Sequence, residues 1–142
     1  MPKRLPSEEF NRIYSKVPRL CVDIVVKSSE GILLTKRAIP PSIGYWHIPG
    51  GTIMHGETLE QAVKRVAEKE LGVDVKIIKI LGATEFLSDK TTIMGHAVSI
   101  PHLVKVISGK IKLDNQASEY RFFKKIPGKT IPEHKKFLES YK

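Results

Sequence analysis

Apolar residues along the chain gather in short runs, most of which predict strands. LCVDIVV at 20–26 is apolar at nearly every position and rich in β-branched residues, as in a strand buried on both faces. SSEG at 28–31 predicts a turn, and ILLTKR at 32–37 predicts the returning strand of a hairpin. The same reasoning predicts further strands over 45–49, 74–87 with a bend near Gly82, 96–106 and 119–123.

Two helices are predicted from their start and stop signals. Ser7, followed by two glutamates, begins a helix over 7–16, because a hydroxyl cap and early acids suit the positive end of a helix. Thr58 has capping-box spacing to the glutamine three residues on and begins a helix over 58–71. Gly72 supplies the C-terminal stop of this second helix.

Prolines mark two further elements. Pro132 lies between Thr130 and Glu133, whose capping-box spacing predicts a closing helix that runs to about residue 141. Pro101 lies within the strand at 96–106 and predicts an edge position or a bulge, because proline cannot donate to a strand ladder. Loops are predicted over 38–44, 88–95 and 114–118.

This order of elements predicts an α/β fold in layers, with hairpins and long strands, a central helix and a terminal helix. No G-x-G-x-x-G sequence joins a strand to a helix, which excludes a Rossmann dinucleotide site. The length of 142 residues suits a single domain over 1–142 with its own hydrophobic core.

Composition narrows the class of protein. No apolar run reaches the ~20 residues that cross a bilayer, and the first residues show no signal peptide. Cys21 is the single cysteine, so no internal disulfide is possible, and its apolar surroundings predict a buried, inert thiol. We therefore expect a cytoplasmic protein that does not contact a membrane.

The formal net charge of +9 is compatible with two interpretations. Such a charge attracts nucleotides, phosphates and nucleic acid, and it also serves simply as a solubilising surface. Lysines are scattered among glutamates, as in VKRVAEKE, and no basic stripe alternates with aromatic residues. We therefore expect no nucleic-acid partner, while an anionic small molecule stays open.

The helix over 58–71 carries an acid on its apolar side. With ~100° per residue, four apolar residues fall within about 80° of Leu59, and Glu70 falls at about 20°. An unpaired buried carboxylate costs several kcal/mol, so a cation such as a divalent metal should meet it. The alternative is that the apolar stripe already leaves the core in this last turn. The four residues are Ala62, Val63, Val66 and Ala67.

The residues around this helix resemble the Nudix box, G-x5-E-x7-R-E-U-x-E-E-x-G-U, in which U is aliphatic. The lead-in GYWHIPGG at 44–51 is also similar to that family. The resemblance implies a Nudix-type α/β/α sandwich with a mixed sheet. The matching positions are Gly51, Glu57, Arg65, Glu70, Gly72 and Val73.

Two glutamates of the box are missing. Val66 and Lys69 stand in their places, and Glu68 lies ~160° from Glu70 around the helix and cannot substitute. Such a reduced box should hold one divalent ion at most, with the substrate diphosphate completing its coordination. The reduced box resembles that of the GDP-mannose mannosyl hydrolases, a branch in which the box also keeps only the last glutamate. Other segments of this branch match in order over most of the chain, including LLTKR and DNQ-x-x-x-YRF.

The resemblance to that branch implies a set of roles. Mg²⁺, or Mn²⁺, would be held by the carbonyl of Gly50, the carboxylate of Glu70 and the side-chain oxygen of Gln116. Arg37 would neutralise the diphosphate of a nucleoside-diphosphate sugar. Phe10 would pack against the bound nucleotide, and the chain would form a homodimer.

Each role has a structural alternative. Arg65 would either brace the phosphate side of the substrate or form a structural ion pair with Glu57. Arg37 could be a solvated charge at the end of its strand, and Gln116 an ordinary loop residue. Phe10 shares a helix face with an isoleucine and could belong to the core alone.

The branch attacks the sugar carbon with water, giving GDP plus mannose, and uses a histidine base directly after the glutamine. Here that position is Ala117, so activity should be reduced, because general-base help is worth ~10²–10⁴ in rate. His96 matches another histidine of the family and is a candidate for catalysis, beside His47, His55 and His102.

Two alternative functions stay open. One is a Nudix diphosphatase that cuts at phosphorus, and the other is a non-catalytic module that binds a nucleotide sugar.

Overall fold

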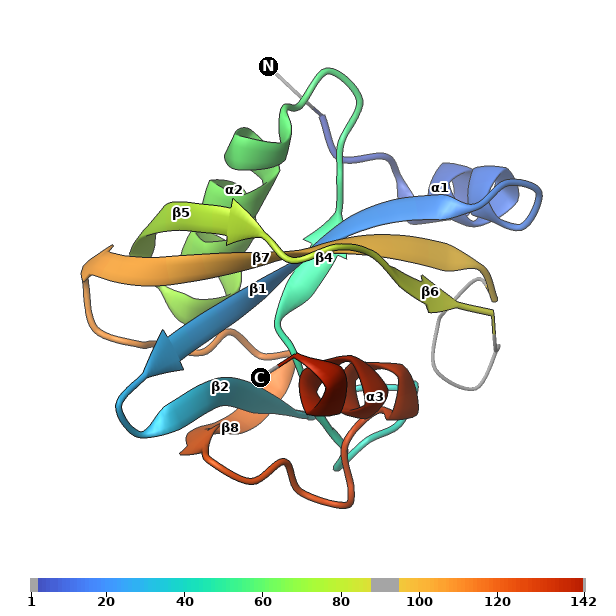
Figure 1. Cartoon of the computed structure of the whole chain (residues 1–142). Coiled ribbons are helices and arrows are strands. Elements are labelled where there is room, and N and C mark those ends of the chain that lie inside the picture. Colours follow the sequence, from blue (N-terminus) through green and yellow to red (C-terminus); the bar gives the residue numbers. More distant parts are fainter. Residues whose placement is uncertain (1–2, 88–94, 142) are drawn as a thin grey trace.

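The structure is a computed structural model of the chain, and it describes residues 3–87 and 95–141 (Figure 1). The predicted loop over 88–95 therefore lies, except for its last residue, outside the described residues. No helix among the described residues has the length and apolar character needed to span a membrane. The elements in chain order are α1 (Ser7–Tyr14), β1 (Arg19–Ser28), β2 (Gly31–Arg37), β3 (Trp46–His47), β4 (Gly50–Thr52), α2 (Leu59–Leu71), β5 (Asp74–Ile80), β6 (Thr84–Phe86), β7 (Ala97–Ser108), β8 (Ala117–Phe123) and α3 (Pro132–Ser140).

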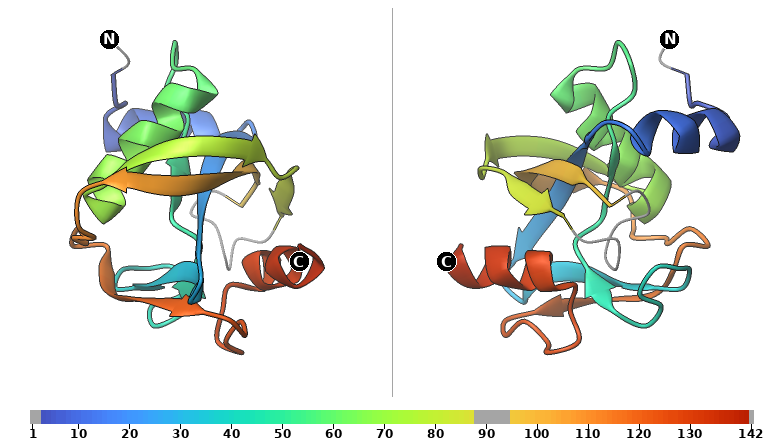
Figure 2. Two further views of the ribbon diagram at one scale, coloured as in Figure 1. Left: turned by 60° about the vertical axis from the view of Figure 1, so that its left-hand side comes forward. Right: turned by 90° about the vertical axis from the view of Figure 1, so that its right-hand side faces the viewer.

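Strand β1 connects two groups of strands. The main order is β3-β2-β1-β7-β5, and β4 pairs with β1, β6 with β7, and β8 with β2. Strands β1 and β7 are parallel, and every other pair is antiparallel. Helix α2 packs against β1, β4 and β5, whereas α3 lies on another side of the strands and contacts β6 (Figures 1 and 2). The predicted α/β sandwich with a mixed sheet is confirmed.

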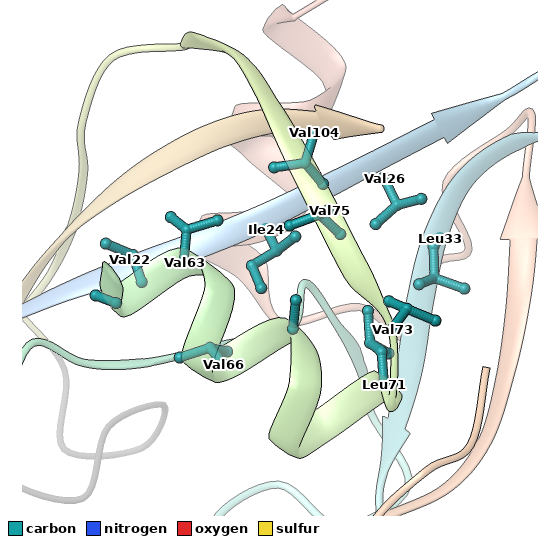
Figure 3. Packing of buried hydrophobic residues seen from close by; sticks show 12 residues of the cluster. Val22, Ile24, Val26, Leu33, Val63, Val66, Leu71, Val73, Val75 and Val104 are labelled. Carbon is teal, nitrogen blue, oxygen red and sulfur yellow. The ribbon is translucent and has the colours of Figure 1, made fainter. Parts of the chain in front are cut away.

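Both faces of β1 are buried, as its sequence predicts, and residues 21–26 are all buried. On one face, Val22 and Ile24 pack with the apolar stripe of α2 (Figure 3). On the other face, Val25 packs with Leu34 of β2 and with Leu138 of α3. The strand therefore joins two apolar clusters, one under each helix.

The signals at the ends of α2 are confirmed. The Thr58 hydroxyl accepts the N–H of Gln61 at 3.1 Å, and the Gln61 side chain accepts the N–H of Thr58 at 2.9 Å. Gly72 has φ 66°, the left-handed conformation that ends helices and favours glycine. The helix therefore begins and ends where local chemistry dictates, which fixes the position of Glu70 in its last turn.

The capping box predicted for α3 is wrong. Ile131 caps this helix without a side-chain hydrogen bond, and the hydroxyl of Thr130 donates to the carbonyl of Pro127 at 2.7 Å. Pro132 is the first helical residue, where its fixed φ suits the helix and its missing N–H costs nothing. Proline, and not a hydroxyl cap, therefore starts α3.

The edge position predicted from Pro101 is also wrong, because β7 has neighbours on both sides. The carbonyl of Pro101 accepts the N–H of Leu81 at 2.8 Å, between the end of β5 and the start of β6. The N–H and C=O of a strand residue point to the same neighbour, so the missing N–H faces the gap at Gly82. An inner strand accommodates proline here because its neighbour is interrupted.

Strand β4 was not predicted, because Gly50 and Gly51 have low strand propensity. It pairs antiparallel with β1, with Gly50 opposite Asp23 and Thr52 opposite Cys21. A Cβ at Gly50 would collide with Oδ1 of Asp23, so only glycine permits this approach. The pairing carries the chain from the PGG sequence directly beneath α2.

Candidate active site

A cleft of about 540 Å³ runs between α1, β1, β4 and the last turns of α2. At one end it continues into a narrow pocket that collects polar side chains from four separate segments. Residues of β2, β3, α2 and the segment that leads into β8 meet there, including the first residue of β8. The pocket is lined by Thr35, Arg37, His47, Glu70, Asp114, Gln116 and Ala117.

Glu70 lies half-buried at the end of α2 and lines both the pocket and the cleft. Burial raises the pKa of its carboxyl to about 8, and the negative charges of Asp114 and Asp23 act in the same direction. Lys69 and a backbone hydrogen bond from Gly50 oppose this shift only in part. The acid on the apolar stripe thus points into the pocket and the cleft, and its surroundings disfavour the charged form.

Arg37 ends β2 at the opposite wall of the pocket. Its Nε donates to the carbonyl of Pro41 and its Nη2 to that of Pro40 at 3.3 Å, so the loop after β2 orients the guanidinium. Burial lowers the pKa of Arg37, and the charge of Glu70 opposes that change. The side chain is half-buried and faces Glu70 across the pocket, unlike a solvated charge at a strand end.

Gln116 is brought to the pocket by hydrogen bonds to its backbone. Its carbonyl accepts the N–H of Ala38 at 2.9 Å, and its N–H donates to Oδ1 of Asp114 at 3.1 Å. Arg37 and Ala117 are paired residues of β2 and β8, which sets Gln116 beside Arg37. Asp114 was not singled out from the sequence, although an acid two residues before Gln116 is the signal that could have found it.

Arg65 and Glu57 form a bidentate ion pair. Nε of Arg65 lies 2.6 Å from Oε2 of Glu57, and Nη2 lies 3.0 Å from Oε1. Nη2 also donates to the carbonyl of Thr52 at 2.9 Å, and Glu57 accepts the N–H of Met54 at 2.9 Å. The pair therefore braces the loop between β4 and α2, as the structural interpretation of these two residues predicts, and Arg65 also lines the cleft.

Phe10 lines the far part of the cleft together with Tyr14, and their ring centroids are 4.7 Å apart. Helix α1, which carries both, has no buried residue, so the interpretation of Phe10 as a core residue is wrong. Arg19 from β1 lines the same part and donates to the hydroxyl of Thr52 at 2.9 Å. This end of the cleft therefore offers aromatic surface and a cation.

The structure does not bring His96 to the other candidates. It is exposed just before β7 and does not line the cleft. His102 is buried in β7 with Nδ1 2.8 Å from the carbonyl of Ile100, also away from the cleft. His47 and His55 do line it. Burial, His134 and Arg37 hold the pKa of His47 well below its usual value, so its ring is neutral at pH 7.

His134 is a cleft residue that sequence reasoning missed. It projects from α3, is buried, and lies with Nε2 3.3 Å from Oδ2 of Asp23. Asp23 is the single acid in the buried run of β1, and that position was the available signal for it. Nothing in the pattern of α3 marks His134, because its partner comes from a distant strand.

Comparison with known proteins identifies the family. The NUDIX domain matches residues 17–140. The chain belongs to the Nudix family. It is 36% identical over 124 residues to the low-salt glycan biosynthesis protein Agl8 of Haloferax volcanii, covering 84% of this chain and 80% of that protein. It is 34% identical over 126 residues to an ADP-ribose pyrophosphatase of Methanocaldococcus jannaschii, covering 87% and 73%.

A solved Nudix structure shows the same fold. The MutT NUDIX hydrolase from Burkholderia pseudomallei aligns with a TM-score of 0.80 at 24% identity, over 89% of this chain and 100% of that chain. This match shows a shared fold, and the NUDIX domain match shows the family, whose hydrolases generally use Mg²⁺ or Mn²⁺.

The donors in this Nudix site fit a single hard cation. Glu70 offers a carboxylate, Gln116 an amide oxygen and Gly50 a backbone carbonyl, all oxygen ligands that Mg²⁺ accepts. Glu70 and Gln116 line both the pocket and the cleft, and Gly50 lines the cleft beside them. Among the described residues no three His, Cys, Asp or Glu side chains gather closely enough to hold a metal by themselves. Substrate phosphates would complete the coordination.

Proposed function

We propose that this Nudix hydrolase cleaves a nucleoside-diphosphate sugar with the help of Mg²⁺ or Mn²⁺, and that GDP-mannose is converted to GDP and mannose. One observation carries the proposal: Arg37, Glu70 and Gln116, from three distant segments, line one pocket at the end of a long cleft. A cation site beside an oriented guanidinium suits a diphosphate, and the cleft leaves room for groups on both sides of it.

The residues of the pocket have separate roles in this proposal. Gly50, Glu70 and Gln116 hold the cation, which when bound neutralises negative charge on the diphosphate. Arg37, fixed by the carbonyls of Pro40 and Pro41, donates to phosphate oxygens. Charge that develops on the departing diphosphate therefore meets donors that are already oriented.

Water attacks the sugar carbon in this reaction. A new C–O bond forms to water, the bond from the sugar carbon to the phosphate oxygen breaks, and its electron pair leaves with the nucleoside diphosphate. The water also loses a proton. Ala117, which lines the pocket, has no group to accept it. We therefore expect slow turnover, lower by ~10²–10⁴ than with a positioned base.

A second candidate is a diphosphatase that cuts at phosphorus. Two observations favour it: a relative at 34% identity is an ADP-ribose pyrophosphatase, and Ala117 removes the base that attack at carbon uses. A third candidate is a module that binds the nucleotide sugar without cleaving it.

Product analysis in ¹⁸O-labelled water separates the three candidates. The purified protein is incubated with Mg²⁺ and either GDP-mannose or ADP-ribose, with Glu70→Gln as the matched inactive variant. Label in free mannose, together with GDP, supports attack at carbon. Label in GMP or mannose 1-phosphate favours the diphosphatase, and saturable binding without products favours the binding module.

Phe10 and Tyr14 are proposed to hold the nucleobase. Stacking of a base on an aromatic side chain is worth ~1–3 kcal/mol. Phe10→Ala should therefore raise KM by about tenfold and leave kcat nearly unchanged. The proposed homodimer is tested by analytical ultracentrifugation, in which a monomer at micromolar concentration would contradict it.

A further inference from the structure

Asp23 and His134 form a buried polar pair that the proposed reaction does not use. Their relative exposures are 5% and 6%, and both line the cleft. Oδ2 of Asp23 and Nε2 of His134 lie 3.3 Å apart, yet neither atom makes a well-aligned hydrogen bond with any described group, the other one included. Two buried polar groups cost free energy unless they act on each other or on a ligand, so the pair requires an explanation.

The ring of His134 is fixed in one orientation. Its Nδ1 accepts the backbone N–H of Ile48 at 3.0 Å, so in the neutral ring the proton lies on Nε2, toward Asp23. The ring of Phe86 packs edge-on against it, with centroids 5.2 Å apart. The Nε2–H of His134 therefore lies at a fixed place on α3, 3.3 Å from a carboxylate oxygen that belongs to β1.

Asp23 reaches the proposed cation site through Gly50. The two residues are opposite each other in the β1–β4 pair, and Oδ1 of Asp23 fills the space where a side chain at position 50 would begin. The backbone of Gly50 also forms a hydrogen bond with Glu70, and the charges of Asp23 and Glu70 act on each other. Gly50 thus lies between two carboxylates, only one of which comes from the Nudix box.

We propose that His134 is a positioning residue that holds Asp23 beside Gly50, so that Asp23 supplies a second negative charge to the cation held by Gly50, Glu70 and Gln116. This inference rests on the proposed function. It explains how a Nudix box that has Val66 and Lys69 in place of two glutamates can still attract a divalent ion. The missing charge comes from β1 and is kept in place by α3.

The test measures the affinity of the metal-free protein for Mn²⁺ by electron paramagnetic resonance of free Mn²⁺. Asp23→Asn should weaken binding by about 10-fold or more, within the ~10–100-fold typical of outer-shell partners. His134→Leu should weaken it similarly. His134→Gln should bind nearly as the wild type does, because its amide oxygen can accept from Ile48 and its N–H can donate to Asp23.

Two controls keep the result interpretable. His102→Leu removes another buried histidine, away from the cleft, and should leave Mn²⁺ affinity unchanged. The double variant of Asp23→Asn and His134→Leu should lose no more affinity than either single variant, because both remove one interaction. Thermal unfolding identifies any variant that fails to fold. If His134→Leu does not fold, the Mn²⁺ affinities of Asp23→Asn and His134→Gln decide whether the pair supports metal binding.

Three outcomes overturn the inference: wild-type Mn²⁺ affinity in Asp23→Asn, wild-type affinity in a folded His134→Leu, or equal losses in His134→Gln and His134→Leu. Product analysis of the same proteins separates this failure from failure of the proposed function. If the wild type hydrolyses the substrate and the variants keep its Mn²⁺ affinity, only the role of the Asp23–His134 pair is refuted. Weakened Mn²⁺ binding without any hydrolysis sinks only the proposed reaction.

Discussion

Two glutamates of one motif, at the two ends of α2, have opposite electrostatic environments. The pKa of Glu57 is lowered, first by its hydrogen bond from Arg65, although burial works against it. The pKa of Glu70 is raised to about 8, first by burial and then by Asp114. Glu57 already has its cation within the protein, whereas Glu70 lies near two further acids, Asp114 and Asp23, whose effect Lys69 offsets only in part.

This difference separates a structural acid from a functional one. The ion pair of Glu57 is complete, and its remaining hydrogen bonds hold the loop that enters α2. Among the described residues Glu70 forms no ion pair, and it borders the pocket where Arg37 and Gln116 converge. A half-buried acid that lines a cleft and has a strongly raised pKa is the better candidate for binding an external cation.

The largest expected effect is on catalysis in Glu70→Gln. The kcat on the substrate that the product analysis identifies should fall more than about 100-fold, because even outer-shell partners of metals are worth ~10–100-fold. Glutamine resembles the protonated acid, so the thermal midpoint of the metal-free protein should hardly change. Glu68→Gln, on the exposed side of the same helix, is the control. Full activity in Glu70→Gln would remove this acid from the site.

A smaller effect, on stability and not on catalysis, is expected for Arg65→Met. It leaves Glu57, whose side chain is 3% exposed, without its cation and should lower the free energy of unfolding by about 2 kcal/mol, below the ~3–5 for fully buried pairs. Arg121→Met breaks an equally short but exposed pair with Glu119 and should cost less than about 0.5 kcal/mol. Urea titration measures both, and equal losses would contradict the bracing role.

The third prediction concerns pH and the affinity for metal. Below pH about 8 the metal must displace the proton of Glu70, so apparent Mn²⁺ affinity should rise by about tenfold per pH unit and level off near pH 8. Isothermal titration calorimetry in buffers of different ionisation enthalpy counts the released proton. Proton release that is zero at pH 7 would show that Glu70 is ionised before the metal binds.

The smallest expected effect is the contribution of Glu57 to stability at acid pH. Its folded pKa lies below the unfolded value of 4.5, so its stabilisation is fully present above pH 4.5 and is lost as pH falls through the folded pKa. Thermal midpoints between pH 3 and 6 should therefore fall less steeply in Arg65→Met than in the wild type. Parallel curves for the two proteins would show that the pair does not perturb this acid.

The parts of the site that lie on one helix could be predicted from the sequence. The rotation of ~100° per residue puts Glu70 on the apolar side of α2, and the capping box with Gly72 sets where that helix starts and stops. Arg65 on the helix and Glu57 just before it were singled out by the resemblance to the Nudix box. These signals involve only neighbouring residues in the sequence, so the start and the end of α2 could be predicted. The opposite happened at Thr130, where proline and the surrounding chain determined the helix start.

Contacts between distant segments could not be predicted in this way. The chain before α3 joins β3 through hydrogen bonds of Trp46 with Lys129 and Ile131, and this docking places His134 beside Asp23. No periodicity in either segment encodes that meeting. Asp114 likewise gains its significance only from the fold, which sets its loop against the end of α2.

Strand β1 serves the apolar core and the cleft at the same time. Val22 and Ile24 face α2, whereas Cys21 and Asp23 line the cleft. If the pairing of β1 shifted by one residue, the carboxylate of Asp23 would point into the apolar core under α2, and Val22 would point into the cleft. The core and the cleft therefore depend on the same register of β1. Any substitution along this strand that aims to change specificity must preserve that register.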